Sequence, residues 1–460
     1  MSAIDPVLGR VRSGLRWPTW ETWDDANRPS PLVRAPLRRD AQPTDHETRG
    51  AAIRRRVDLA QTVDRGGPYL DIFSEQVQQR LADEMGTELG PLSSFTFAIK
   101  DLLAVEGRPM RAGSAVRADA PAETSTAPFV AMLENLGAVA VGTVTLHEFA
   151  FGVTGVNGFA GTAVNPSARD RITGGSSSGS AAAVADGSAR IAIGTDTGGS
   201  IRGPASFCGV VGYKPSFGTY PDAGVFPLSG TLDHVGLFAA NVSDVIATHT
   251  ALGYAVDPVA LPTRVGVARA DIEAADDDVQ QGVEAALAAL RDAGVEVVDV
   301  TLPDAEKTFV TSTAIMFSEA AAIHAAGLAA HGERYGADIL ARLELGASLT
   351  SVEVATAHEY RRQLVAEILA TLADVDVIVG PTTPMAAPPV ADAGDPSLPP
   401  RIVANTRLGN VVGLPGISLP LPLDGPPAGL ALLGSSDARS LSYAGAIEPL
   451  LAIAGATSAE

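Results

Sequence analysis

The chain has 460 residues, of which 46% are hydrophobic, so it has an ordinary globular composition and is long enough for one large α/β domain or two domains. Its formal charge of −20 argues against nucleic acid and against an anionic membrane surface as partners. The single cysteine, Cys208, excludes an internal disulfide, and the lack of a leading apolar segment or an uninterrupted membrane-length apolar run predicts a cytoplasmic protein.

Residues 1–45 are predicted to form an N-terminal extension, and residues 46–460 a single domain. Six prolines interrupt the extension, so long regular elements are not expected there. It also holds all three tryptophans, Trp17, Trp20 and Trp23, whose spacing places them on one helical face. The extension is interpreted either as an arm that these aromatic side chains hold to the core, or as a lid or a dimer contact.

The first half of the domain alternates helical patterns with apolar strand patterns, which predicts an α/β core. The expected elements are a helical region over 46–86 broken at Gly66-Gly67-Pro68, with a second helix over 75–86 that ends at Gly86, a strand within 94–105 that ends at Lys100, a helix over 126–136, and strands over 138–144 and 191–195.

The lysine at the end of the strand within 94–105 is unusual for this chain. Only three lysines occur, Lys100, Lys214 and Lys307, and the other basic residues are arginine or histidine. Desolvation can remove the proton of a lysine but in practice not that of an arginine, so a buried Lys100 is a candidate base. The alternative interpretation is a structural ion pair between Lys100 and Asp101.

His147-Glu148 is the one pair that suggests a metal or acid–base site outside this region. No second histidine stands at helical spacing from it, so the usual zinc motif is missing, and the seven histidines are scattered along the chain. A structural role is expected for the pair, and no metal or cofactor is predicted.

Two glycine-serine clusters dominate the middle of the chain. The first begins at Gly174 and runs into a small-residue helix, and the second ends at Ser200 after a strand. A path of helix, turn and strand can bring the second cluster back to the first, which would place Ser176 beside Ser200. The clusters are bounded by apolar segments, unlike a linker, and no lysine follows either one, unlike a phosphate-binding P-loop.

The clusters supply what a serine nucleophile needs, which is a base and donors for an oxyanion. Ser200 is predicted to be the nucleophile, Ser176 its proton relay and Lys100 the base, provided that burial lowers the lysine pKa. The backbone N–H groups nearby are those of Thr197, Gly198 and Gly199.

The second half is predicted to contain a β-α-β unit over 264–301, helices over about 316–331 and 351–374, a strand over 376–380, and a helix with strands over 404–434. Residues 384–401 hold six prolines and are expected to be irregular. This loop either borders a pocket or is a passive surface loop.

The two clusters, as GGSSSGSAAAVA and DTGGSIRGPA, together with Lys100, resemble the amidase signature family of serine hydrolases. The resemblance is close from Phe97 to about Asp244, weaker from Val377 to Gly434, and generic over about 255–370. It departs from the usual pattern at Ser178, where glycine is frequent, and at Ser94-Phe95-Thr96, where Gly-Val-Pro is usual. Neither departure removes a catalytic group.

The resemblance implies a mixed central β-sheet flanked by α-helices on both sides. It also implies a Ser-cisSer-Lys triad of Ser200, Ser176 and Lys100, with the cis peptide bond running from Gly175 to Ser176. Further implied roles are an oxyanion hole lined by Thr197, Gly198 and Gly199, and support of the active-site loop by Asp196 and Arg202.

The implied activity is hydrolysis of an amide-type C–N bond through an acyl-enzyme on Ser200, without metal or cofactor, by a monomer or homodimer. Carbamate, urethane or ester cleavage on the same triad stays open, as does a glutaminase-type subunit of a tRNA-dependent amidotransferase. A non-catalytic binding protein on this fold would have lost a triad member, and this chain keeps all three. Candidate substrate-binding residues come from loops beside the matched motifs: Phe149, Phe151, Gly152, Val153, Thr382 and Thr383.

Overall fold

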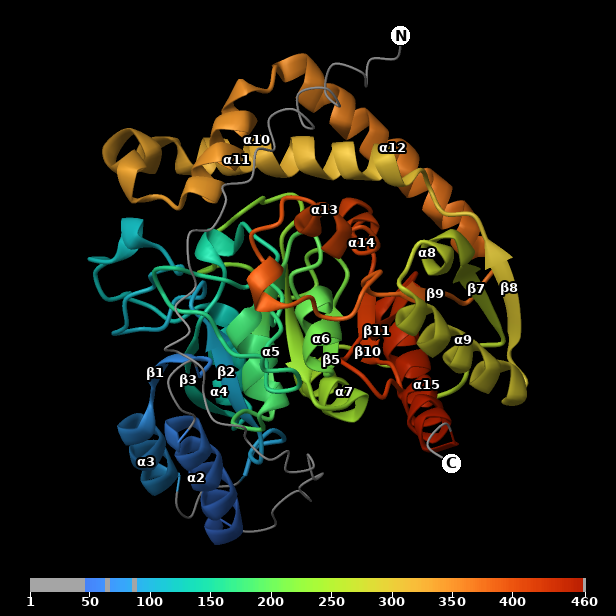
Figure 1. Cartoon of the computed structure of the whole chain (residues 1–460). Coiled ribbons are helices and arrows are strands. Elements are labelled where there is room, and N and C mark those ends of the chain that lie inside the picture. The colour runs from blue at the N-terminus through green and yellow to red at the C-terminus, as the bar shows by residue number, and fades with distance from the viewer. Residues whose placement is uncertain (1–45, 63–66, 85–88, 458–460) are drawn as a thin grey trace.

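A mixed β-sheet runs through the computed structural model, which describes residues 46–62, 67–84 and 89–457 (Figure 1). The eleven strands of the described chain follow the order β1-β3-β2-β4-β6-β5-β10-β11-β9-β7-β8. Their bounds are β1 Tyr69–Ile72, β2 Thr96–Lys100, β3 Val139–Val144, β4 Ile191–Asp196, β5 Val211–Lys214, β6 His234–Ala239, β7 Arg264–Ala268, β8 Glu296–Val300, β9 Val377–Pro381, β10 Gly416–Pro420 and β11 Gly429–Gly434.

Parallel and antiparallel pairs are grouped along the sheet. Strand β2 lies parallel to both of its neighbours, β3 and β4, and β7 lies parallel to β8 and β9. The strands between these two groups pair antiparallel. Since β2 and β4 run in the same direction, Lys100 at the end of β2 and the loop after β4 emerge at the same edge of the sheet.

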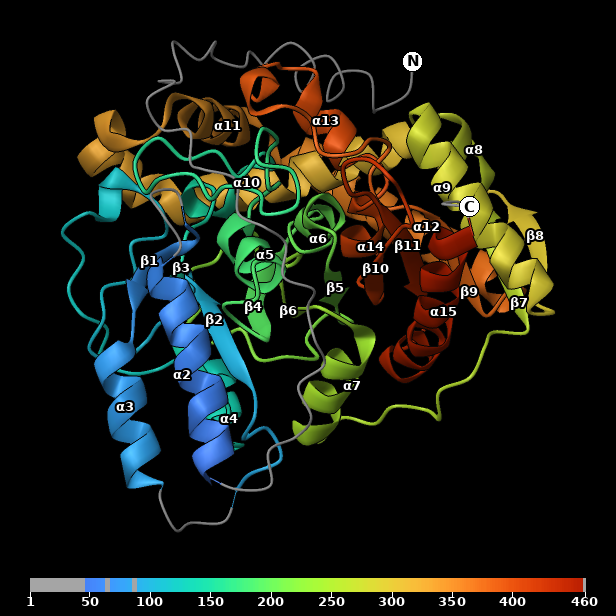
Figure 2. The same ribbon diagram turned by 60° about the horizontal axis from the view of Figure 1, so that its bottom comes forward.

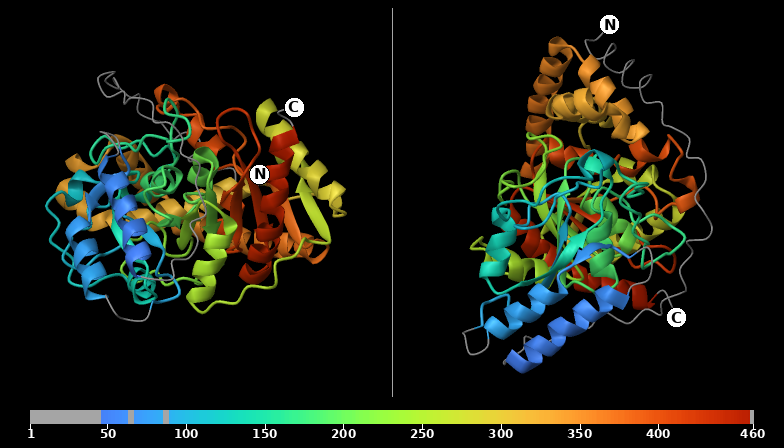
Figure 3. Two further views of the ribbon diagram at one scale, coloured as in Figure 1. Left: turned by 90° about the horizontal axis from the view of Figure 1, so that it is seen from below. Right: turned by 90° about the vertical axis from the view of Figure 1, so that its left-hand side faces the viewer.

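Helices cover both faces of the sheet, as predicted. The bounds of the longer ones are α2 His46–Thr62, α3 Ser74–Asp83, α4 Pro128–Asn135, α5 Ser178–Ala185, α6 Arg202–Cys208, α7 Val242–Ala251, α9 Asp277–Asp292, α10 Ala305–His331, α11 Ala337–Ser348, α12 Ser351–Ala373 and α15 Asp437–Thr457; shorter ones are α8 Arg269–Glu273, α13 Leu398–Ile402 and α14 Arg407–Val411. Helices α2 and α3 lie side by side at one end of the molecule, and α10, α11 and α12 stack at the opposite end (Figures 2 and 3).

The side chains of each central strand alternate between two hydrophobic cores. Ala192 and Phe238 pack with α5 and α6 on one face, whereas Ile193 and Leu237 pack in the larger core on the other face, which also holds side chains of α7 and α15. The α5 face is built from alanines and Gly179, where a Cβ would lie 2.6 Å from the Thr145 carbonyl oxygen. The small residues therefore let α5 approach the sheet closely and fix the first glycine-serine cluster against β2.

Most predicted elements are present, with shifted ends. The strand β1 and the helix α11 were not expected, because β1 has only four residues, none of them buried, and α11 lies in the generic middle of the chain. Helix α10 begins at Ala305 rather than 316, since the Asp304 side chain accepts a hydrogen bond from Lys307 N–H at 2.6 Å and caps it. The short helix α13 begins within the predicted loop over 384–401 and ends one residue after it. Both the tryptophan-bearing extension and Gly86 lie outside the described residues.

One described helical stretch, Ala305–Arg334, is long and apolar enough to cross a membrane by length and composition. The sequence prediction considered only uninterrupted apolar runs and therefore passed over it. The helix packs against α11, α12 and α14, and a core helix meets the same criterion, so this finding carries no membrane assignment.

Candidate active site

The two glycine-serine clusters meet, as predicted. The backbone N–H of Ser177 donates to the carbonyl oxygen of Ser200 at 3.3 Å, which joins the residue after Ser176 directly to the second cluster. The peptide bond between Gly175 and Ser176 is cis, which confirms the bond geometry implied by the family resemblance.

Lys100 is completely buried beneath these clusters. Its Nζ lies 2.8 Å from Ser176 Oγ, 2.9 Å from Ser177 Oγ and 2.8 Å from Thr195 Oγ1. The Asp101 carboxylate instead accepts from the backbone N–H of Arg111, at 3.3 Å to each oxygen. The structure therefore favours the interpretation of Lys100 as a base over the ion pair with Asp101.

Burial lowers the pKa of Lys100 to about 7, against smaller opposing effects of the Asp233 and Asp196 carboxylates. The three hydrogen-bond partners of the amine are hydroxyl groups. A hydroxyl can accept from or donate to an uncharged amine, so these contacts do not require the amine to be protonated. This lowering of the pKa increases the uncharged fraction of the lysine near neutral pH, which is the form that the predicted base requires.

Asp196 organises the turn that carries Ser200. Its carboxylate accepts from Gly199 N–H at 2.7 Å and Ile201 N–H at 3.0 Å, and it forms two hydrogen bonds with the Arg202 guanidinium at 3.0 and 3.1 Å. Burial alone would raise the pKa of Asp196, but Arg202, Lys214 and Asn410 outweigh it and hold the pKa below its ordinary value. Asp196 and Arg202 thus occupy the positions expected of supporting residues.

Asn410 in α14 completes this network, and the sequence prediction assigned it no role. Its amide donates to the Asp196 carbonyl and carboxylate oxygens, both at 2.8 Å, and accepts from Arg202 at 2.6 Å. The signal was available, because Asn410 lies in the segment GNVVGLPGISLP that carries the weaker half of the family resemblance.

The predicted oxyanion donors divide into two groups. Since Gly199 N–H already donates to Asp196, it is not free to bind an oxyanion, and the prediction is corrected at this position. The backbone N–H groups of Thr197, Gly198 and Ser200 have no acceptor among the residues described. The Ser200 N–H is a candidate donor that the sequence prediction did not include.

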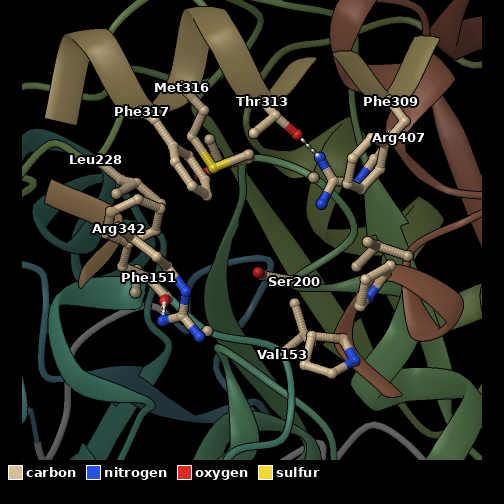
Figure 4. Close-up of a pocket in the computed structure, with 17 residues that line it drawn as sticks. Phe151, Val153, Ser200, Leu228, Phe309, Thr313, Met316, Phe317, Arg342 and Arg407 are labelled. Atoms are coloured by element: carbon tan, nitrogen blue, oxygen red, sulfur yellow. Dashed lines mark hydrogen bonds between the residues drawn. The ribbon is translucent and has the colours of Figure 1, made fainter. Parts of the chain in front are cut away.

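Ser200 lies at the wall of a pocket with about 600 Å³ of empty space, open solvent included. Figure 4 shows the Ser200 hydroxyl facing this space between Arg342 and Arg407. The lining residues are Ala150, Phe151, Gly152, Val153, Thr197, Gly198, Ser200, Leu228, Phe309, Thr313, Met316, Phe317, Arg342, Pro399, Pro400, Val403 and Arg407. Within the described chain, no hydrogen bond links the hydroxyls of Ser200 and Ser176, so the proton path between them is part of the proposal below.

Three of the six predicted substrate-binding residues line the pocket, namely Phe151, Gly152 and Val153. Pro399 and Pro400 also line it, so the proline-rich loop borders the pocket rather than being a passive surface loop.

Phe149, Thr382 and Thr383 do not line the pocket, and these predictions were wrong. The Phe149 ring packs against other rings, with its centre 4.5 Å from the ring centre of His324 and 5.3 Å from that of Phe226. The Thr382 hydroxyl bonds with Ser418 at 2.8 Å. Thr383 bonds with Ser206 at 2.9 Å and donates to the Met385 carbonyl at 2.8 Å. All three side chains are thus used in core packing.

The side chains of His147 and Glu148, the pair considered as a metal or acid–base site, both contact other side chains or backbone groups. His147 lies 3.3 Å from Asp338, and Glu148 accepts from Ser114 at 2.6 Å and from Gly336 N–H at 3.0 Å. Across residues 46–62, 67–84 and 89–457, no group of three or more His, Cys, Asp or Glu side chains has an arrangement that could hold a metal ion.

Comparison with known proteins identifies the family. A family model described as Amidase matches residues 70–438. The chain belongs to the amidase family. It is 33% identical to a glutamyl-tRNA(Gln) amidotransferase subunit from Koribacter versatilis, over 80% of this chain and 87% of that protein.

Other members of the amidase family show the same likeness under different names. The 2-amino-5-chloromuconic acid deaminase of Comamonas testosteroni is 34% identical, over 80% of this chain and 84% of the relative. A crystal structure described as an amidase superposes with a TM-score of 0.81 and 30% identity, covering 88% of this chain and 98% of that one. The chain is therefore an enzyme of a family that acts on carbon–nitrogen bonds, and the mixed α/β fold is that of its structural neighbours.

Proposed function

We propose that this protein hydrolyses an amide C–N bond through an acyl-enzyme on Ser200. The observation that carries this proposal is the 2.8 Å contact between Lys100 Nζ and Ser176 Oγ, directly beneath the pocket wall that holds Ser200. A buried amine with a lowered pKa beside a serine relay is what a serine nucleophile without a histidine requires.

In the first half-reaction Ser200 Oγ attacks the amide carbonyl carbon. The Ser200 proton passes to Ser176 Oγ while the Ser176 proton passes to Lys100 Nζ. The backbone N–H groups of Thr197, Gly198 and Ser200 bind the oxyanion that forms. The C–N bond then breaks, and the leaving amine receives the proton back through Ser176, which leaves an ester between Ser200 and the acyl group.

In the second half-reaction a water molecule attacks this ester. Its proton follows the same route to Lys100, and the Ser200–acyl bond breaks as Ser200 regains a proton. The products are a carboxylic acid and an amine, and the triad returns to its starting state. Esters and carbamates form the same type of tetrahedral intermediate, so they are tested together with amides.

A screen of purified protein against aryl anilides, aliphatic amides, ureas, carbamates and esters tests this function. We expect Ser200→Ala to lower turnover of the best substrate by about 10⁴-fold or more, since the nucleophile is removed. Ser125, an exposed serine that does not line the pocket, provides the matched control, and Ser125→Ala should retain full activity. Wild-type-like turnover in Ser200→Ala would contradict the proposal.

A glutaminase subunit of an amidotransferase is the second candidate, because several relatives carry the name of such a subunit. It would release ammonia from glutamine and depend on partner subunits. We propose instead a monomer or homodimer that acts alone in the cytoplasm on a small molecule, without nucleic acid or membrane, which the charge of −20 supports. Purification of the chain alone as an active amidase would favour this proposal, whereas glutaminase activity that appears only with partner subunits would favour the second candidate.

A further inference from the structure

The pocket holds two arginines that the catalytic proposal does not use. Arg342 belongs to α11 and Arg407 begins α14, and both line the cavity that contains Ser200 (Figure 4). The sequence prediction assigned no function to either residue. Their surroundings differ in one respect, which is the charge of their partners.

Arg342 is neutralised by the protein itself. Its guanidinium lies 2.9 Å from the Asp338 carboxylate, one helical turn away, and it also donates to the Phe151 carbonyl oxygen. This arginine therefore has a structural partner and ties α11 to the loop that contains Phe151 and Val153.

Arg407 has only uncharged partners among the residues described. One guanidinium nitrogen donates to the hydroxyls of Ser312 at 2.7 Å and Thr313 at 2.9 Å, and the guanidinium carbon lies 4.5 Å from the Phe309 ring centre. Its Nε is buried without a hydrogen-bond acceptor. Burial, and secondarily the nearby Arg342, lowers the pKa of Arg407 to about 10, so the guanidinium still carries its charge at neutral pH.

Arg407 is also fixed next to the nucleophile. The hydroxyl of Thr406 donates to the Gly198 carbonyl oxygen at 2.7 Å, and a Cβ on Gly198 would lie 4.0 Å from Arg407 Cγ. Gly198 is two residues from Ser200 and offers one of the free N–H groups. The charge of Arg407 is thus held at a set position relative to the site where the amide carbonyl would bind.

No carboxylate side chain is found among the described residues that line the pocket. The whole lining consists of Arg342 and Arg407, two threonines, Ser200, and otherwise glycine or apolar residues. A buried cation without a counter-ion is costly, and a bound anion removes that cost. An arginine fork binds a carboxylate with particularly good geometry.

We propose that the pocket takes an amide that bears a carboxylate, with the carboxylate bound by Arg407 and the scissile carbonyl at Ser200. This inference rests on the proposed hydrolase function and specifies its substrate class. Free glutamine fits less well, because its ammonium group would find no acidic side chain among the described lining residues. An apolar or aromatic connecting part suits the walls formed by Phe317 and Met316.

Matched substrates test this inference without any variant. Monoanilides of α,ω-dicarboxylic acids with 4-nitroaniline are compared with 4-nitroanilides of simple fatty acids of equal chain length and of ω-amino acids. N-acyl 4-aminobenzoates and N-acyl anilines form a second pair, with the carboxylate on the leaving group. We expect kcat/KM to be at least tenfold higher for the anionic member of one pair, and lowest for the cationic substrate. Equal kcat/KM across charges in both pairs would overturn the inference.

Variants then locate the preference. Arg407→Gln should reduce kcat/KM for the anionic substrate at least tenfold more than for its neutral partner, and Arg407→Lys should restore part of the difference because it keeps the charge. Arg362 is an exposed arginine outside the pocket, and Arg362→Gln is the matched control. Thermal unfolding of each variant is followed to ensure that folded protein is compared. An equal loss for both substrates in Arg407→Gln would contradict the assignment.

Binding to Ser200→Ala separates this inference from the hydrolase proposal. The dicarboxylic monoanilide should bind this variant, measured by calorimetry, and lose at least tenfold in affinity when Arg407→Gln is added. If that binding pattern holds but wild type cleaves nothing, the hydrolase proposal fails while the carboxylate site stands. If wild type cleaves neutral and anionic amides equally, with equal binding, the hydrolase proposal stands and the carboxylate site fails.

Discussion

The nucleophile region, which we define as Lys100 and residues 174–202, differs sharply from the pocket wall, defined as the residues of 305–411 that line the cavity. The nucleophile region is built from neighbouring strands, small residues and hydroxyls that approach within 3 Å of one another. The pocket wall comes from α10, α11, α13 and α14, which reach the site from a different part of the chain. The comparison shows that the residues proposed to carry the chemistry and those proposed to select the substrate come from separate parts of the chain.

Among the changes that distinguish the two regions, replacing the base in the nucleophile region should reduce kcat/KM the most. Lys100→Met keeps the length of the side chain and removes the amine, so we expect kcat/KM to fall by about 10²–10⁴-fold for every substrate, regardless of its charge. The matched control is Lys307→Met, since Lys307 lies outside the pocket lining and pairs with Gln363 and Glu367. Steady-state kinetics with a charged and a neutral amide would show the effect, and a loss confined to one of them would place Lys100 in substrate binding instead.

The pH dependence of kcat/KM tests whether Lys100 acts as the base. The base acts in its uncharged form, and burial lowers the pKa of Lys100 to about 7, so activity should rise with pH around a midpoint near 7 and level off above it. A substrate that does not titrate between pH 5 and 9 isolates the enzyme group. Activity that increases toward acid would exclude an uncharged lysine as the base.

A change where the nucleophile region contacts Thr406, the residue before Arg407 of the pocket wall, should have an intermediate effect on kcat. Gly199 has a φ of 133°, and a Cβ there would overlap the Thr406 hydroxyl, so Gly199→Ala should displace the loop that carries Ser200. We expect kcat to fall by roughly 10–100-fold, because catalysis depends on loop geometry. Gly203→Ala is the control, since no atom outside its own helix lies within 4 Å of the added Cβ. Similar kinetics for both variants would show that the loop tolerates displacement.

The smallest effect is expected from the pocket wall alone. Phe317 stacks edge-on against Phe151 with 5.0 Å between ring centres, and both rings line the cavity. Phe317→Ala should raise KM by roughly threefold to tenfold for amides with an apolar body, as apolar contact is lost, with kcat nearly unchanged. Phe217, an exposed phenylalanine, serves as the control. A fall in kcat with KM unchanged would instead place Phe317 in the catalytic step.

The sequence was most informative where the chemistry depends on local residue type. A lysine at the end of an apolar strand, in a chain with three lysines, indicated a buried amine, and Lys100 is one. The same reasoning would also have predicted Lys214 as a candidate base. Lys214 is buried too, but its amine donates to the carbonyl oxygens of Pro215 and Leu414. Only the family motifs distinguished the two lysines.

The sequence was least informative where partners come from distant segments. That Gly199 N–H donates to Asp196 rather than facing the pocket depends on how the turn after β4 closes. Thr382 and Thr383 follow β9 directly, but their hydroxyls bond with Ser418 and Ser206 from other elements. Arg342 lies in the generic middle of the chain and Arg407 well beyond it, and only the packing of α10, α11 and α14 brings them to one cavity.

The most direct test of the central claim is to trap the covalent intermediate. A slowly turned-over 4-nitrophenyl ester or anilide is mixed with the protein, the reaction is quenched in acid, and the digested protein is analysed by mass spectrometry. We predict an acyl adduct on the peptide that contains Ser200, absent from the Ser200→Ala variant and increased in amount when deacylation is slow. Turnover without any adduct under burst conditions, or an adduct on another residue that survives in Ser200→Ala, would contradict an acyl-enzyme on Ser200.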